Sequence, residues 1–231
     1  MKKLIVLIAL LSCTALNAQE LMESDYYVKI KSGVAIPLGD FAGNTLYESA
    51  FADPGFFAGI DVGWKAFDRL GFIVSGDLAI NPVRASDLGA AKVAADPFLI
   101  DLRTRSEPFK VFSAMGGLTY DSEIFKYLNI NSFVSIGMAY GETPYTLYKS
   151  QYFLTGPDYF EITPAGSYGF AYKIGADLEY DIKTQWGIFV GASYMHTKFS
   201  FKFITNGGTG ERIENKKVDL LNVVFGIRLK L

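Results

Sequence analysis

The sequence has almost none of the residues that build metal centres and disulfides: one cysteine, Cys13, and one histidine, His196, in 231 residues. These two residues cannot supply the usual ligands of a zinc site. Nucleotide-binding signatures are missing as well, since neither G-x-x-x-x-G-K nor a strand-anchored G-x-G-x-x-G occurs. We therefore expect no metal, no other cofactor and no disulfide framework.

Long apolar runs and an excess of charge are also lacking. No stretch after the N-terminus reaches the roughly 18 consecutive apolar residues of a spanning helix. The net charge is −2 and the basic residues are scattered, which argues against a nucleic-acid partner. Yet half of the residues are hydrophobic, with 14 Tyr, 19 Phe and 23 Gly, a composition that is unusual for a soluble enzyme.

Residues 1–18 have the features of a secretory signal peptide. A positively charged start precedes the apolar stretch Leu4 to Leu11, and small residues precede a cleavage site before Gln19. A second interpretation is that Cys13 belongs to a lipoprotein box and becomes a lipid-modified N-terminus. Export without an apolar helix leaves three fates: a soluble secreted protein, a lipid-anchored protein or a membrane β-barrel.

The final segment, Val218 to Leu231, shows the pattern that recurs along the chain. From Leu221 onward every second residue is apolar, and the residues between are mostly small or polar. Successive strand side chains point to opposite faces, so one face is apolar and the other carries charge. An apolar strand at the end of a chain is protected from aggregation if it pairs with the first strand and closes a barrel.

Alternation of this kind predicts about eight strands. They are Tyr26–Ile36, Phe56–Ala66, Leu70–Ile80, Phe109–Tyr120, Leu128–Tyr140, Ala165–Tyr180, Trp186–Phe203 and Val218–Leu231. Short turns connect alternate pairs, and the long connections are 37–54, 81–108, 141–164 and 204–216, the second with a short helix capped by Ser86. Short periplasmic turns and long extracellular loops are typical of outer-membrane barrels. Residues 19–231 are thus predicted to form one all-β domain, a closed antiparallel transmembrane β-barrel.

Aromatic residues gather at the strand ends next to the short turns. They are Tyr26, Tyr27, Trp64, Phe67, Phe72, Tyr120, Tyr127, Tyr180 and Trp186. Barrels in membranes carry aromatic girdles at both interfaces. These residues are therefore predicted to form the periplasmic girdle.

The segment Tyr26 to Phe41, Y-Y-V-K-I-K-S-G-V-A-I-P-L-G-D-F, the recurrent G-x-D and G-x-x-Y in the strands, and the alternating terminus together resemble the small outer-membrane β-barrel proteins. These include OmpX, the OmpA-type transmembrane domain and the group described as outer membrane protein beta-barrel domain. The resemblance covers Gln19 to Leu231 and implies an outer-membrane location in a Gram-negative bacterium. One departure is Leu231, because such barrels often end on an aromatic residue that the insertion machinery recognises.

The predicted inward positions carry charges of both signs. They are Lys29, Lys31, Lys65, Lys173, Arg228 and Lys230 against Asp61, Asp77, Asp177 and Glu179. An eight-stranded barrel is only wide enough for side chains to fill it, and buried charges must pair. We expect a plugged interior held by salt bridges; a narrow channel for small or hydrophobic solutes is the alternative.

An enzyme that modifies lipid A is a third hypothesis, and His196 is its only candidate base. Lys198 occupies the position where an H-x-S pattern would place a serine. Alternation directs His196 toward lipid headgroups, and we predict no catalytic residue.

The long connections are rich in aromatic residues, which either pack as a cap over the barrel or bind a surface ligand. The expected function is a non-enzymatic outer-membrane protein that serves envelope integrity or surface interaction. Its expected partners are outer-membrane lipid and lipopolysaccharide, the barrel-insertion machinery, and a surface ligand or protein at the four long connections.

Overall fold

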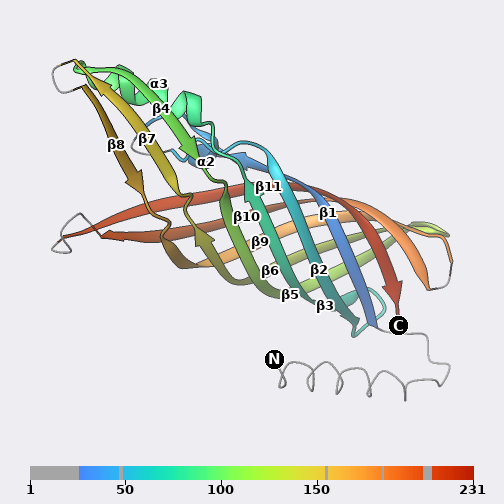
Figure 1. Cartoon of the computed structure of the whole chain (residues 1–231). Coiled ribbons are helices and arrows are strands. Elements are labelled where there is room, and N and C mark those ends of the chain that lie inside the picture. The colour runs from blue at the N-terminus through green and yellow to red at the C-terminus, as the bar shows by residue number, and fades with distance from the viewer. Residues whose placement is uncertain (1–25, 47–48, 154–155, 184, 205–209) are drawn as a thin grey trace, which may run out of the picture.

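The structure is a computed structural model that describes residues 26–46, 49–153, 156–183, 185–204 and 210–231 (Figure 1). The expected signal peptide and Cys13 lie outside the described residues. None of the helices in the described part of the chain is long and apolar enough to cross a membrane.

Eight antiparallel strands form a closed barrel, as predicted. They are β1 (Tyr26–Leu38), β2 (Gly55–Lys65), β3 (Leu70–Asn81), β5 (Phe109–Phe125), β6 (Leu128–Glu142), β9 (Gly166–Asp181), β10 (Trp186–Ile204) and β11 (Glu211–Lys230). Their order around the ring is β1-β11-β10-β9-β6-β5-β3-β2. The first and last strands pair with Ile30 opposite Ile227 and Ser32 opposite Phe225, so the sheet has no free edge in the barrel wall.

The alternation predicted for the closing strand is confirmed. Phe225 and Ile227 are exposed on the outside, at 64% and 50%, whereas Val224 and Arg228, the residues before and after this stretch, are buried in the lumen. A barrel whose outer face is apolar and whose lumen is packed with polar groups is inside out relative to a soluble protein. This arrangement suits a wall surrounded by lipid.

The two ends of the barrel differ. The turn end carries the short connections 66–69, 126–127 and 182–185, and the loop end carries the long ones. Beyond the loop end, β4 (Leu99–Ser106), β7 (Thr146–Tyr152) and β8 (Gly156–Ile162) form a separate sheet in the order β4-β7-β8, with α3 (Ala85–Ala95) against β4 (Figure 1).

All four of the predicted loops are therefore partly regular structure, and the first, 37–54, contains the short helix α2 (Gly39–Ala42). The connections 81–108 and 141–164 pair with each other through β4 and β7, a long-range pairing that local sequence patterns do not reveal. Most of the predicted loop 204–216 is wrong, because β10 continues to Ile204 and β11 begins at Glu211. The first residues of β11, E-R-I-E-N-K-K, form no continuous apolar face, so the alternation pattern did not identify them as a strand. The predicted helix is present, but Ser86 does not cap it; Arg84 precedes it without a side-chain cap.

Candidate functional site: a charged lumen closed by an apolar plug

Lys29 is the centre of the ion pairs in the lumen. Its side chain is fully buried, with Nζ 2.8 Å from Asp177 Oδ2 and 2.5 Å from Glu179 Oε1. The same ammonium donates a hydrogen bond to Asn131 Oδ1 at 2.9 Å. Strands β1 and β9 are separated by β10 and β11 in the ring, so the bond between Lys29 and Asp177 runs through the lumen rather than along the wall.

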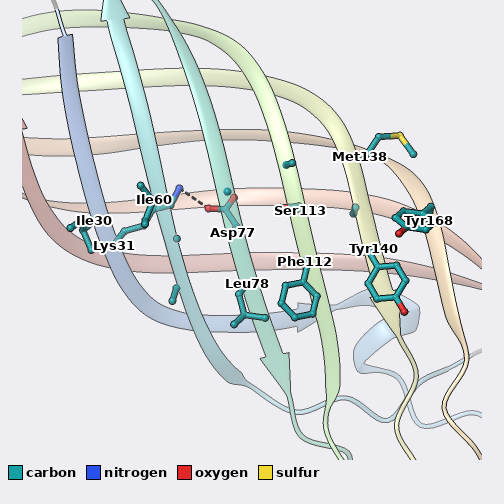
Figure 2. Close-up of a pocket in the computed structure, with 15 residues that line it drawn as sticks. Ile30, Lys31, Ile60, Asp77, Leu78, Phe112, Ser113, Met138, Tyr140 and Tyr168 are labelled. Carbon is teal, nitrogen blue, oxygen red and sulfur yellow. Dashed lines mark ion pairs between the residues drawn. The ribbon is translucent and has the colours of Figure 1, made fainter. Parts of the chain in front are cut away.

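A second cluster lies nearer the middle of the barrel. Lys31 Nζ is 2.7 Å from Asp61 Oδ1 and 3.0 Å from Asp77 Oδ1, the pair marked in Figure 2. Asp77 also accepts a bond from Lys173 Nζ at 2.7 Å. Because β5 and β6 lie between β3 and β9, this last contact also crosses the lumen.

A third group of charges lies at the turn end. Arg228 pairs with both Glu179 and Asp181, and Lys230 Nζ lies 3.0 Å from the other oxygen of Asp181. The guanidinium thus ties β11 to β9 across the intervening β10. A planar fork with several donors suits two carboxylates better than a single ammonium would.

Two carboxylates of the lumen, Asp121 and Asp181, were not among the predicted interior residues. The sequence interpretation placed both in turns, but β5 continues through Asp121 and β9 ends only at Asp181. Asp121 lies 2.8 Å from Lys65 Nζ and accepts a bond from Asn131. The signal was available, since the alternation of Thr119 with Asp121 and of Glu179 with Asp181 continues the inward row.

The structure places the predicted interior charges as follows. Lys29, Lys31, Asp61, Asp77, Lys173, Asp177, Glu179 and Arg228 are all less than 9% exposed, and Lys65 and Lys230 are about one-third exposed near the turn end. With Asp121 and Asp181, the six cations of this set face six anions. Equal numbers avoid the large penalty of an unpaired buried charge.

An apolar plug fills the lumen at the loop end. Phe199, Phe201 and Leu220 point inward from β10 and β11 and are almost fully buried. Helix α2 (Gly39–Ala42) adds Phe41, whose ring meets that of Phe109 at 5.3 Å between centroids. Part of the aromatic connection 37–54 is therefore a cap, one of the two expected arrangements.

Small polar side chains lie between the charged and apolar levels. Asn222 is 0% exposed, and neither atom of its side-chain amide has a hydrogen-bond partner among the described residues. The same holds for the hydroxyls of Ser113, Ser135 and Thr197. Buried polar groups of this kind commonly bind ordered water.

The aromatic residues at the turn end face outward, with one exception. Tyr26, Trp64 and Phe72 stack in a row on neighbouring strands, with ring centroids 6.1 and 5.8 Å apart. Phe67, Tyr120, Tyr127, Tyr180 and Trp186 are also exposed. Tyr27 is the correction: it is 3% exposed and points into the lumen, where its ring lies against Gly63. The physical reason is strand alternation, since Tyr26 and Tyr27 cannot both face lipid.

A shallow hollow of about 710 Å³ lies in the outer wall, and Figure 2 shows the residues that line it. Ala58, Gly76 and Ala114 face outward from β2, β3 and β5, and larger side chains such as Phe112 and Met138 surround them. A Cβ added at Gly76 would meet nothing within 4 Å.

His196 faces outward on β10, toward the loop end, as expected. Its Nδ1 lies 2.7 Å from Asp219 Oδ1 on β11, and its ring lies 5.2 Å from that of Tyr172. Tyr194 donates its hydroxyl hydrogen to the same carboxylate. In the part of the chain that the structure describes, no group of three His, Cys, Asp or Glu residues is arranged to hold a metal ion.

Neither the protein-family models nor the curated protein sequences contain a match to this chain. Among solved structures it is similar to neisserial surface protein A (NspA), at 14% identity over 90% of this chain and 98% of that one, with a TM-score of 0.50. Ail of Yersinia pestis is 15% identical over 90% of this chain and all of Ail, with a TM-score of 0.42. Identities this low concern the fold alone, which is that of the small outer-membrane β-barrels.

Proposed function

We propose that this chain is a non-enzymatic outer-membrane protein of a Gram-negative bacterium with a closed lumen, and that it acts through its outer surface. In this arrangement the turn end faces the periplasm and the loop end faces the outside. Residues 1–18 direct export and are removed, and the insertion machinery assembles residues 19–231 in the membrane. The role is envelope integrity or surface interaction.

The observation that carries the proposal is the double closure of the lumen. Ion pairs cross it at Lys29–Asp177 and at Lys173–Asp77, and the plug around Phe199 fills it above them. A solute would have to break paired, buried charges and displace packed aromatic rings, both of which are costly. A lumen that is closed in this way supports a function at the protein surface rather than transport through the barrel.

The loop end offers a surface suited to interaction. The sheet β4-β7-β8 and the residues next to its strand ends expose large apolar side chains, namely Phe98, Ile100, Phe153, Tyr159 and Phe160. Strand β8 is exposed along nearly its whole length, and within the described part of the chain it pairs only with β7. Exposed apolar patches and unpaired strand edges are the usual places where partners bind.

The His–Asp pair on the outer face favours a structural role over lipid A modification. A hydrolase of this kind needs a nucleophile within hydrogen-bond reach of the base. Among the described residues, His196 bonds to Asp219 and lies against the ring of Tyr172, and Lys198 stands two residues further along the same face.

Two measurements test the proposal together. Purified protein from isolated outer membranes should migrate differently on a gel before and after boiling, because a folded barrel resists detergent. The same folded protein in a planar bilayer should give no discrete conductance steps. A chain that is monomeric in water without detergent would contradict the membrane assignment, and selective permeation would contradict the closed lumen.

A narrow path for small solutes is the second candidate. The belt of unpartnered polar groups around Asn222 is the observation that favours it, because such groups hold water and water can be exchanged for a solute. Conductance that disappears in an Asn222→Leu variant would support this candidate over the first.

A further inference from the structure

Two lysines face each other on the outer surface of β10 and β11. Lys198 and Lys217 are register partners, so their Cβ atoms are neighbours across the two strands. Like charges in directly opposite positions destabilise a strand pair unless an anion lies between them. Lys198 is exposed and makes no ion pair with any residue that the structure describes.

Several residues set the height of this pair in the membrane. Outward positions of β10 are apolar from Trp186 to Val190, followed by Ala192 and Tyr194, and become polar at His196. Lys198 is twelve residues beyond Trp186. Twelve residues of a strand tilted by about 40° rise roughly 30 Å, and the apolar band of such barrels is about 25 Å tall. The two ammonium groups thus lie just beyond the hydrocarbon, at the headgroups of the outer leaflet.

A second feature marks the same level independently. Tyr172 on β9 and Tyr194 on β10 lie directly below, with ring centroids 6.3 Å apart. Tyr172 is the register partner of His196, which comes two residues before Lys198 on β10. Tyrosines concentrate where apolar wall meets polar headgroups. They place the interface immediately beneath Lys198 and Lys217.

The neighbouring charges leave the lysines able to bind an anion. Asp40 Oδ2 lies 3.5 Å from Lys217 Nζ, and this pair is about half exposed. An ammonium has three donors, so Lys217 retains two for another ligand. Asp219 is engaged by His196 and Tyr194 instead.

We propose that Lys198 and Lys217 form a binding site for a phosphate group of lipid A in the outer leaflet. This inference rests on the proposed outer-membrane function and names the lipid that the β10–β11 face contacts. A phosphate between the two ammonium groups would remove their repulsion, and acyl chains of the same lipid would lie along the apolar residues below, such as Tyr194 and Leu221. Lipid A is the occupant we infer, because its phosphates lie at the level of the lysines.

The test compares two double variants of the folded full-length mature chain in detergent micelles. Lys198→Gln with Lys217→Gln removes the site, and Lys126→Gln with Lys183→Gln removes the same charge from the turn end. Binding is measured with bisphosphorylated lipid A, with lipid A stripped of its phosphates, with phosphatidylglycerol and with inorganic phosphate. Each variant is first checked for heat-modifiable migration.

The first variant should bind bisphosphorylated lipid A about thirtyfold more weakly than the unmodified chain, and the turn-end variant should bind it normally. Dephosphorylated lipid A should not distinguish the three proteins. Unchanged binding by the first variant would overturn the site. Equal competition by phosphatidylglycerol or inorganic phosphate would overturn the assignment to lipid A. Loss of heat-modifiable migration in the unmodified chain would instead refute the proposed function.

Discussion

Replacing Lys29 with methionine should destabilise the barrel severely. Methionine has a similar length, so the change removes the charge while it largely preserves volume. It deletes contacts to Asp177, Glu179 and Asn131, all with a fully buried ammonium. Arg228 still pairs with Glu179, which leaves the Asp177 carboxylate as the group without its cation.

The expected loss is about 3–5 kcal/mol in the free energy of unfolding, the usual result when one partner of a buried pair is removed. With a urea dependence of about 2 kcal/mol per molar, the midpoint should fall by roughly 2 M. A second variant, Lys29→Met with Asp177→Leu, removes both charges. It should be more stable than Lys29→Met alone, because no uncompensated charge remains.

The assay is urea unfolding in lipid vesicles, followed by tryptophan fluorescence. Both reporters, Trp64 and Trp186, face outward at the turn end and leave the lipid when the barrel unfolds. Lys183→Met in the exposed turn is the control and should change stability by less than about 0.5 kcal/mol. A wild-type midpoint for Lys29→Met, or a double variant weaker than the single one, would refute the argument that paired charges hold the lumen.

Two further predictions concern the loop end. Phe199→Ala should lower the free energy of unfolding by about 3–5 kcal/mol, because the ring is fully buried in the plug, without producing conductance in a planar bilayer, since the ion pairs below remain; an unchanged urea midpoint would show that the plug does not contribute. Burial, with a smaller effect of Glu214, raises the pKa of Tyr148 to about 12, so the absorbance titration of wild type minus Tyr148→Phe should show a midpoint near 12 rather than 10. Because this pKa is higher in the folded state, the associated stability is complete below pH 10 and is lost as pH rises through about 12; a midpoint at 10 would mean that β7 does not bury the ring.

The correct and incorrect parts of the sequence interpretation share one cause. Strand alternation is local, and it predicted the eight barrel strands and the outward face of His196. The pairing of β1 with β11 followed from the need to cover the edge of an apolar terminal strand. Alternation would also have placed Tyr27 in the lumen. Tyr27 was instead assigned to the aromatic girdle together with Tyr26, because both lie at the same strand end. Asp121 and Asp181 were missed because strand ends were set at the last aromatic residue rather than at the last alternating one.

The pairing of the charges could not be read from the sequence. Lys29 is the register partner of Asp61 on the next strand, yet its ammonium lies against Asp177 and Glu179 on β9. Which carboxylate a lysine reaches inside a closed ring depends on the diameter and tilt of the barrel, because long side chains cross the lumen as easily as they follow the wall.

The amino-acid order alone determined that this chain would be a closed sheet with an apolar exterior, because a period of two in side-chain character is set residue by residue. Only the tertiary structure decided how the lumen closes, with six cations matched to six anions and phenylalanines packed above them, and that two distant connections would join as β4 and β7. Those features depend on distances between residues far apart in the chain, which exist only once the ring has formed.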